Sequence, residues 1–211
     1  MDDNTKIFIE SLLPAESEIE QELREYAQRY RVPILRSDAA AFVRTLVSIK
    51  KPARILEVGT AIGYSAILMS EIVPEAHIDT IEIDPDSVIE ARKNIKKAGA
   101  EDKIRVIAGD GNEVLPALRQ TYDMIFMDAA KGQYIHLYDD AMRLLNNGGL
   151  LLCDNCIFYG KVLSKPEEAP HKHRTIVANL RAFLEKVMSE ESLEASLLDV
   201  GDGMLVACKK F

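Results

Sequence analysis

The sequence has no tryptophan, only three cysteines and no long hydrophobic run. No apolar segment reaches the roughly 18 residues that a membrane-spanning helix needs, and the N-terminal residues lack the charged-then-apolar order of a signal peptide. An odd number of cysteines cannot form a complete set of internal disulfides, so buried or free thiols in a reducing compartment are expected. These absences predict a cytoplasmic protein without membrane contact.

Basic side chains are also scarce, because 26 lysines and arginines face 34 aspartates and glutamates, which gives a formal net charge of −8. This balance argues against nucleic-acid binding through bulk charge, although it leaves room for a local basic patch. The 211 residues are 47% hydrophobic and 28% charged, which is typical of a globular protein. Length and even composition predict a single domain over 1–211, with a helical N-terminal part over 1–50 and an α/β core over 51–211.

Hydrophobic periodicity predicts the order of helices and strands. Three helices are expected over 3–13, 16–30 and 37–49, and Ser37 is a good N-cap for the third. Five apolar runs then alternate with helical stretches. The predicted strands are 54–58, 78–83, 104–108, 124–127 and 149–153, and the helices between them are 64–73, 86–98, 113–118 and 133–145. Continuous apolar strands separated by helices indicate a parallel sheet covered on both faces.

The C-terminal third completes this sheet. A helix over 174–188 precedes two further apolar runs, 193–199 and 204–208, which are joined by a short glycine-rich turn. Such a short connection favours an antiparallel hairpin at the edge of the sheet. The predicted fold is therefore α/β, with a doubly wound, mostly parallel, Rossmann-like sheet of seven strands, N-terminal helices and a C-terminal antiparallel hairpin.

An acidic residue stands at the end of each of the first five predicted strands. These residues are Glu57, Glu82, Asp110, Asp128 and Asp154. Turns favour aspartate in any protein, so one or two acidic residues at strand ends would need no functional explanation. Ligands of doubly wound sheets bind at the carboxyl ends of the strands, and acids at all five ends predict a ligand site there.

The first three strand ends indicate a nucleoside without phosphates. The turn after Glu57 begins with Gly59 but lacks the G-x-G-x-x-G pattern of a dinucleotide site. Glu82 can accept hydrogen bonds from ribose hydroxyls, and Asp110 can accept one from an adenine amino group. S-adenosylmethionine (SAM), a cationic nucleoside, fits this set. Each feature alone has a plainer explanation, since the glycines could serve an ordinary strand-to-helix turn and Glu82 could be a solvated strand end.

Three segments resemble the class I, cation-dependent O-methyltransferases that include the catechol and caffeoyl-CoA O-methyltransferases. They read ILEVGTAIGYSA, DMIFMDAAKGQY and GGLLLCDN, and the resemblance runs from about residue 33 to the C-terminus. It implies a SAM-dependent enzyme that forms a homodimer. The SAM contacts that it implies are Glu57, Gly59, Ser65, Glu82, Asp110, Gly111 and Asp128, with a backbone contact from Leu35.

The fourth and fifth strand ends carry the expected catalytic site. Asp128 and Asp154 follow neighbouring parallel strands, and two carboxylates so close need a cation or a shared proton. With Asn155 they form an all-oxygen set that suits Mg²⁺ and, less well, Mn²⁺ or Ca²⁺. An Asp-Asn pair alone is an ordinary turn, but the family resemblance implies that all three bind the metal. Lys131 would then act with Asp128 in catalysis, as the base or as a positioning group for the acceptor hydroxyl.

A competing interpretation is a zinc-binding module. Cys153 and Cys156 form a C-x-x-C pair, and His171 and His173 follow. The spacing argues against it, because structural zinc sites place their histidines three to five residues apart. Cys153 also falls inside a predicted buried strand, where a thiol behaves as a small hydrophobic group.

The methyl acceptor has two candidates. The segments RVPI, AIGYSAI, DAAKGQY and VGDG resemble one branch of the family, the bacterial tRNA 5-hydroxyuridine methyltransferases, which implies 5-methoxyuridine in tRNA as the product. A dense basic stretch over 161–174 could contact phosphates or could simply be a solvated loop. Its basic residues are Lys161, Lys165, His171, Lys172, His173 and Arg174. The alternative is a small acceptor of the catechol or caffeoyl-CoA type, although Phe158 stands where the plant caffeoyl-CoA enzymes usually carry tryptophan.

Overall fold

The computed structural model describes residues 3–211, apart from the side chains of residues 3 and 6, so the first two residues of the predicted N-terminal part lie outside it. The helices are α1 Asp3–Ser11, α2 Glu18–Tyr30, α3 Ser37–Lys50, α4 Tyr64–Ile72, α5 Pro85–Lys97, α6 Gly111–Ala117, α7 Tyr134–Leu144 and α8 Arg174–Ser189. The strands are β1 Arg54–Val58, β2 His77–Glu82, β3 Ile104–Ala108, β4 Tyr122–Met127, β5 Leu145–Cys153, β6 Leu193–Leu198 and β7 Met204–Lys209. Single 3₁₀ turns occur at η1 Lys131–Gln133, η2 Lys161–Leu163, η3 Pro166–Glu168 and η4 His171–His173.

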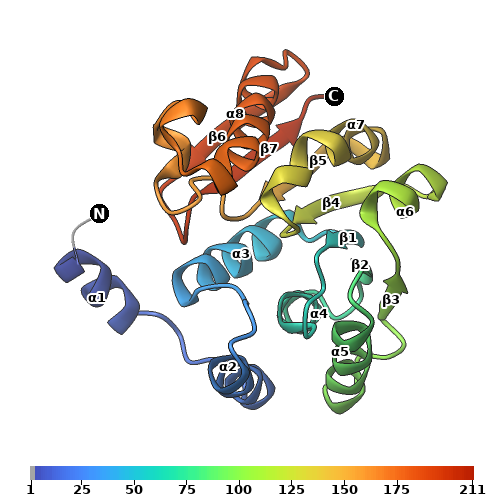
Figure 1. Ribbon diagram of the computed structural model, residues 1–211. Helices are drawn as coiled ribbons and strands as arrows, with labels where there is room; N and C mark the ends of the chain where they lie inside the picture. The colour runs from blue at the N-terminus through green and yellow to red at the C-terminus, as the bar shows by residue number, and fades with distance from the viewer. Residues whose placement is uncertain (1–2) are drawn as a thin grey trace.

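All seven strands form one sheet in the order β3-β2-β1-β4-β5-β7-β6 (Figure 1). The strands β1 to β5 pair in parallel, and β7 runs antiparallel to both β5 and β6. The predicted mostly parallel sheet with a C-terminal hairpin is therefore confirmed. In this order β1 and β4 are neighbours although three helices and two strands separate them in the chain, which makes their junction the switch point where such folds bind ligands.

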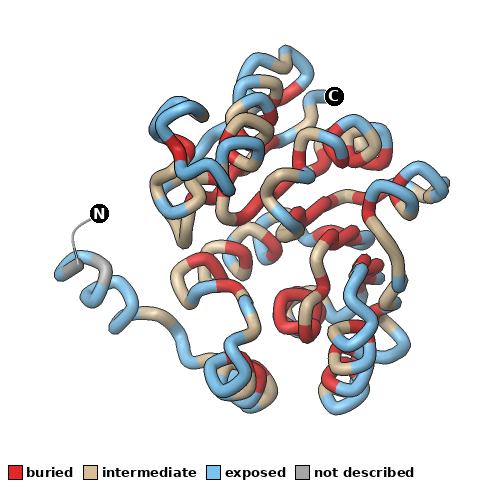
Figure 2. Tube along the Cα trace, viewed as in Figure 1, coloured by how far each residue is buried: buried red, intermediate tan, exposed pale blue. Residues whose placement is uncertain are grey.

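The two faces of the sheet bury two separate hydrophobic cores. Side chains alternate along β4, so Met124 and Phe126 enter one core and Ile125 and Met127 enter the other. The first core is closed by α2, α3, α4 and α5, and the second by α6, α7 and α8. Figure 2 shows the buried positions concentrated in the strands and on the inner sides of these helices, whereas α1 is largely exposed. Helices on both faces confirm the doubly wound arrangement.

One local prediction was wrong. Arg36, not Ser37, occupies the N-cap position of α3, with an extended backbone and no capping side chain, and Ser37 is the first helical residue. The helix therefore begins one residue earlier than the expected Ser37 cap indicates. The side-chain cap is instead found on α2, where Ser17 and Glu20 form a reciprocal capping box.

The helices over residues 3–211 do not include a membrane-spanning candidate, because none of them is both long and apolar enough to cross a membrane.

Candidate active site

Strand register brings the predicted site residues to one edge of the sheet. Val58 pairs with both Ile81 and Met127, and Met127 pairs with Cys153. The residues that directly follow these positions are Gly59, Glu82, Asp128 and Asp154. They border a cavity of about 580 Å³, which we call the strand-end cavity. Its lining includes Val32, Pro33, Ile34, Gly59, Ala61, Glu82, Asp110, Gly111, Asn112, Asp128, Lys131, Gln133, Asp154 and Asn155.

Gly59 is required where the first and fourth strands end side by side. Its φ is +108°, and a Cβ added there would lie 2.3 Å from the carbonyl oxygen of Asp128. The Asp128 amide also donates to the Val58 carbonyl at 2.9 Å, which holds the two strand ends together. Any side chain at residue 59 would therefore force apart the switch point of the sheet.

On the β2 and β3 side of the cavity, the acids are held by backbone N–H groups. The Glu82 carboxylate accepts from the Ala61 amide at 2.8 Å and from the Asp84 amide at 2.9 Å. Asp110 is the N-cap of α6 and accepts from both the amide and the side-chain nitrogen of Asn112 at 2.9 Å. These bonds lower the pKa of Asp110, and each carboxylate keeps lone pairs for hydroxyl or amino groups of a ligand.

On the β4 and β5 side, the carboxylates of Asp128 and Asp154 border the cavity together, and the charge of Asp154 acts on Asp128. Burial, followed by the charge of Asp154, raises the pKa of Asp128 to about 7. Burial also raises the pKa of Asp154 to about 6, although the Asn155 amide donates to its Oδ1 at 2.6 Å. The nearest cation is Lys131, whose Nζ lies 3.7 Å from Asp128 Oδ1. A second positive charge at this place would therefore be strongly favoured.

Tyr134 is a structural part of this site that the sequence reasoning missed. Its buried hydroxyl lies 3.1 Å from the Met127 carbonyl oxygen and 2.9 Å from that of Asp154, and it donates to these strand ends. The tyrosine thus keeps the ends of β4 and β5 in register. Tyr134 is the last residue of the segment DAAKGQY, so the motif included this tyrosine but did not show that its hydroxyl bonds to the two strand ends.

Three predicted cofactor contacts do not line the cavity. Leu35, Glu57 and Ser65 are all buried. Glu57 accepts a hydrogen bond from the Thr80 hydroxyl, and burial raises its pKa to about 7. The Leu35 carbonyl accepts from Arg24 Nη1 at 3.1 Å. These three residues are absent from the cavity lining, whereas the connector residues 32–34 form part of it. In the sequence these connector residues stood out only as part of the segment RVPI, with no predicted role in the site.

The zinc set is not assembled. Cys153 and Cys156 are buried free thiols whose pKa values are raised by burial. His171 is exposed, and the ring of His173 packs edge-on against Phe158 with centroids 5.4 Å apart. Within the described part of the chain, no group of three or more His, Cys, Asp or Glu side chains is arranged to hold a metal ion. Asp128 and Asp154 form a pair of acids, which Asn155 extends with an amide oxygen.

Comparison with known proteins gives a consistent family. The sequence profile of the O-methyltransferase family matches residues 10–210. The chain is 34% identical over 179 residues to the catechol O-methyltransferase of Niastella koreensis, which covers 80% of this chain and 79% of that protein. It is 30% identical over 218 residues to the caffeoyl-CoA O-methyltransferase of Populus kitakamiensis, with 97% and 91% covered.

A solved structure extends this comparison to the cofactor. The SAH-bound methyltransferase PaMTH1 of Podospora anserina superimposes with a TM-score of 0.88 at 26% identity, and the match covers 99% of this chain and 95% of that one. Family profile, curated relatives and fold therefore agree. The chain belongs to the O-methyltransferase family and is a SAM-dependent O-methyltransferase.

Proposed function

We propose that the enzyme transfers the methyl group of SAM to a hydroxyl of an acceptor that carries two neighbouring oxygens, and that it uses a divalent cation. The observation that carries this proposal is the pair Asp128 and Asp154, which border the strand-end cavity together and whose pKa values are both raised. Two carboxylates and the Asn155 amide form a set of hard oxygen donors. Such a set fits Mg²⁺ and, less well, Mn²⁺ or Ca²⁺.

The SAM site occupies the other side of the cavity in this proposal. Glu82 accepts from the ribose hydroxyls and Asp110 from the adenine amino group, because both carboxylates border the cavity and keep free lone pairs. Gly59 and Gly111 leave room for the ligand at the backbone, and Asp128 borders both halves. Leu35, Glu57 and Ser65 are buried and do not line the cavity.

Catalysis requires the acceptor hydroxyl to lose its proton near the transferred methyl group. A divalent cation held by the three oxygen donors would stabilise the resulting oxyanion and hold the neighbouring oxygen of the acceptor. Lys131 borders the cavity, with its side chain three-quarters buried, and is placed there to act as the base or as a positioning group for the acceptor hydroxyl. Asp128 holds Lys131 toward the cavity through their 3.7 Å ion pair. The sulfonium then loses its methyl group to the oxygen and leaves as the neutral thioether.

A small acceptor of the catechol type is the first candidate for the substrate. Relatives named as catechol and caffeoyl-CoA O-methyltransferases match nearly the whole chain or four-fifths of it, and a catechol presents two adjacent oxygens. The test is incubation with labelled SAM, Mg²⁺ and a panel of catechols. Transfer to a catechol hydroxyl that stops in EDTA and returns with Mg²⁺ is the expected result, and full activity in EDTA would refute the metal.

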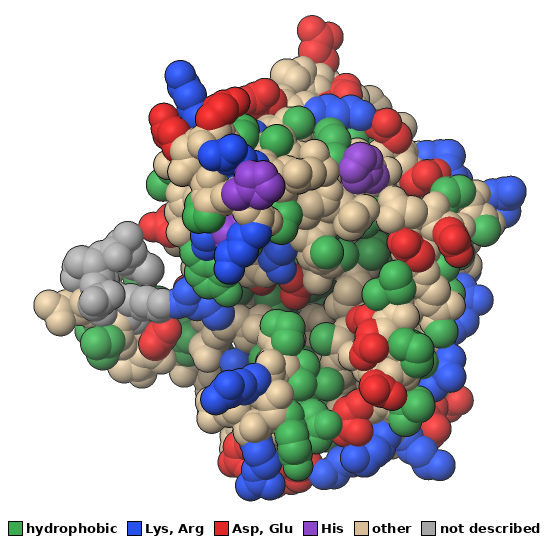
Figure 3. All heavy atoms as spheres, viewed as in Figure 1, with side chains coloured by type: hydrophobic (Ala, Val, Ile, Leu, Met, Phe, Trp, Pro, Cys, Tyr) green, Lys and Arg blue, Asp and Glu red, His purple; other side chains and the backbone are tan. Residues whose placement is uncertain are grey.

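A second candidate, 5-hydroxyuridine in tRNA, is favoured by the surface beside the metal ligands. Lys161 Nζ lies 4.6 Å from the ring centre of Phe158 and 4.9 Å from that of Tyr159, which is 79% exposed. Lys165 and Lys172 are also exposed on the same basic stretch. An exposed aromatic ring among lysines suits a base stacked beside phosphates. In Figure 3, histidine side chains lie in the upper half of the face in view with lysine and arginine side chains near them, and further lysines and arginines lie along its right and lower edges.

The two acceptors are separated by one further arm of the same assay. Unmodified tRNA and tRNA that bears 5-hydroxyuridine are offered in place of the catechols. Methylation of the hydroxylated tRNA alone, with loss on replacement of Lys161, Lys165 and Lys172 by alanine, would support the RNA acceptor. Catechol turnover that these replacements leave unchanged, together with inert tRNA, would assign the enzyme to small molecules.

We also propose that the chain forms a homodimer. Ile7, Phe8 and Leu12 belong to α1 or its end and are each more than 60% exposed, an apolar face that a second copy could cover. Light scattering should give twice the 23.6 kDa mass of one chain. A monomeric mass at micromolar concentration would refute the dimer.

A further inference from the structure

Two distant segments of the chain form neighbouring walls of the strand-end cavity. The connector between α2 and α3 contributes Val32, Pro33 and Ile34, and the turn after β1 contributes Gly59 and Ala61. The connector is followed at once by Leu35, and the glycine turn ends at Tyr64, the first residue of α4. Arg24 of α2 forms a hydrogen bond with each of these two residues. The separation of the walls therefore depends on this one side chain as well as on the sheet.

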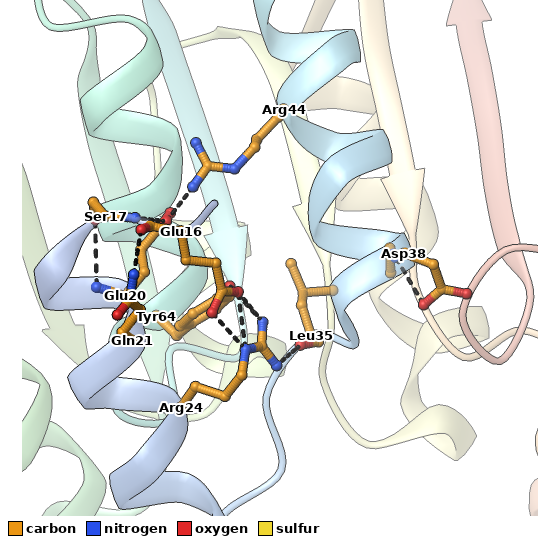
Figure 4. A network of polar contacts seen from close by, with 10 residues as sticks. Glu16, Ser17, Glu20, Gln21, Arg24, Leu35, Asp38, Arg44 and Tyr64 are labelled. Carbon is orange, nitrogen blue, oxygen red and sulfur yellow. Dashed lines mark hydrogen bonds and ion pairs between the residues drawn. The ribbon is translucent and has the colours of Figure 1, made fainter. Parts of the chain in front are cut away.

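Arg24 bonds to both walls through different nitrogens of one guanidinium. Its Nη1 donates to the carbonyl of Leu35 at 3.1 Å, one residue beyond the connector wall. Its Nη2 donates to the hydroxyl of Tyr64 at 2.6 Å, at the start of α4. The guanidinium carbon also lies 5.0 Å from the centre of the Tyr64 ring. Figure 4 shows Arg24 between Leu35 and Tyr64 in this network.

Glu16 fixes the guanidinium in this position. Arg24 Nε donates to both carboxylate oxygens, at 2.9 and 2.8 Å, and the Tyr64 hydroxyl donates to Glu16 Oε1 at 2.6 Å. The side chains of Arg24 and Glu16 are only 20% and 19% exposed, and Tyr64 is 2% exposed. Burial raises the pKa of Glu16, but the bonds from Arg24 and Tyr64 outweigh it and leave the pKa below its usual value. The carboxylate thus stays charged, and its planar pairing with the guanidinium is geometrically specific.

We propose that Arg24 is a positioning residue for SAM, because it holds the connector wall and the glycine-turn wall at the spacing that the cofactor needs. The inference rests on the assignment of the strand-end cavity to SAM. A preformed wall lowers the ordering cost of binding, so loss of the clamp weakens affinity although Arg24 touches no ligand. The planar fork of arginine is essential, since it bonds Leu35, Tyr64 and Glu16 at once.

Calorimetry of SAM binding to the full chain tests the clamp. Arg24→Ala should raise the dissociation constant of SAM by about tenfold, the scale of a lost hydrogen bond to a charged group. Arg24→Lys should recover only part of this loss, because an ammonium cannot make all the bonds of the fork. Tyr64→Phe keeps the buried ring, removes only the hydroxyl, and should weaken binding less than Arg24→Ala. In the double variant the two losses should not add, because both break the same clamp.

Two controls separate positioning from general destabilisation. Glu22→Ala removes an exposed ion pair with Lys97 from the same helix and should leave SAM affinity unchanged. Arg44→Ala leaves the buried Glu20 unpaired and should lower the melting temperature without a matching loss of SAM affinity.

The result that overturns the inference is wild-type SAM affinity in folded Arg24→Ala protein. If that variant does not fold, wild-type affinity in Tyr64→Phe overturns it instead. A loss in Arg44→Ala as large as in Arg24→Ala would also overturn it, because general destabilisation would then explain both. Failure of the unaltered chain to bind SAM would refute the cavity assignment itself, which is a different outcome from wild-type affinity in the variants.

Discussion

The two sides of the strand-end cavity use the same residue type at equivalent places and treat it in opposite ways. On one side, Glu82 and Asp110 end their strands as acceptors for backbone N–H groups, and the pKa of Asp110 is lowered. On the other side, burial raises the pKa of both Asp128 and Asp154, and the charge of Asp154 raises that of Asp128 further. Acidic residues at the ends of neighbouring strands therefore differ in their environment and in what they can bind.

The difference shows what each side can bind. Carboxylates that already accept backbone hydrogen bonds are fixed in place and keep lone pairs that can accept further bonds from neutral hydroxyl or amino groups. Buried carboxylates that repel each other are unfavourable until a positive charge arrives. The first pair suits a nucleoside, and the second suits a metal ion. The register of one sheet thus supplies both halves of the reaction.

Among these tests, removing the charge of Asp154 should have the largest effect on methyl transfer. Asp154→Asn should reduce methyl transfer by roughly a thousandfold, because it removes a metal ligand on which several kcal/mol of catalysis depend. SAM affinity, measured by calorimetry, should stay close to that of the unaltered chain, since the other half of the cavity is intact. The metal-free protein should melt at a higher temperature, because the repulsion on Asp128 is relieved.

The matched control is Asp139→Asn, which alters an exposed acid of α7 that pairs with Lys186. It should change neither activity nor melting temperature. If metal-free Asp154→Asn melted at a lower temperature than the unaltered chain, repulsion between Asp128 and Asp154 would not destabilise the metal-free protein.

Glu57 offers a test of burial on the cofactor side of the sheet. Its pKa is raised from about 4.5 to about 7, so between these pH values the folded chain keeps a proton that the unfolded chain has released. Stability from this residue therefore falls as pH rises through that range, by on the order of 3 kcal/mol in total. Urea unfolding of the cofactor-free protein at pH 5 and pH 8 should show a smaller pH-dependent loss in Glu57→Gln than in the unaltered chain. Equal losses would mean that Glu57 does not titrate in this range.

Glu82→Ala should weaken SAM binding by about 1.5–3 kcal/mol, the scale of hydrogen bonds to a charged acceptor. Calorimetry of the folded variant measures it. Glu90→Ala, which removes a partly buried acid of α5 paired with the exposed Lys93, serves as the control and should bind SAM normally. If Glu82→Ala kept full affinity, the side of the cavity that carries Glu82 and Asp110 would not bind the nucleoside of SAM.

Much of the site could be predicted because it depends on local patterns. Apolar runs located the strands, and parallel pairing then required that Glu82, Asp128 and Asp154 share one edge, as the register confirms. Family motifs supplied the O-methyltransferase assignment, which the comparisons support. The family resemblance also placed Leu35, Glu57 and Ser65 among the SAM contacts. These residues are buried and do not line the cavity, and their contact with SAM stays a prediction.

What escaped prediction depends on contacts between distant parts of the chain. The pairing of Arg24 with Tyr64 joins residues 40 positions apart in the sequence, and the motif that contains Tyr64 does not indicate Arg24 as its partner. Arg36 replaces Ser37 as the N-cap because the connector path, not local propensity, decides where α3 begins. The 3₁₀ turns over 161–173 are too short to leave a periodic signal.

The smallest expected effect concerns Asp202, which links the turn between β6 and β7 to the loop that follows the proposed metal ligands. The Tyr159 amide donates to both carboxylate oxygens of Asp202 at 2.8 and 2.9 Å, and the Ile157 amide donates to its carbonyl at 2.8 Å. Phe158 and Tyr159 both adopt positive φ angles, 50° and 53°, which side chains disfavour. Asp202 therefore stabilises a loop conformation that would otherwise relax.

Asp202→Ala should raise the KM for the methyl acceptor by about fivefold, equivalent to about 1 kcal/mol for a partly solvated hydrogen bond, and should leave SAM affinity unchanged. Asp202→Asn should restore the KM, because its amide oxygen can still accept from the Tyr159 amide. Steady-state kinetics with the acceptor found active, beside calorimetry of SAM, measures both. If Asn failed to rescue, the charge of Asp202 would matter more than its hydrogen bonds. Asp202 would then act on the neighbouring Asp154, whose pKa it helps to raise, and the charged side of the cavity would contain a third acid.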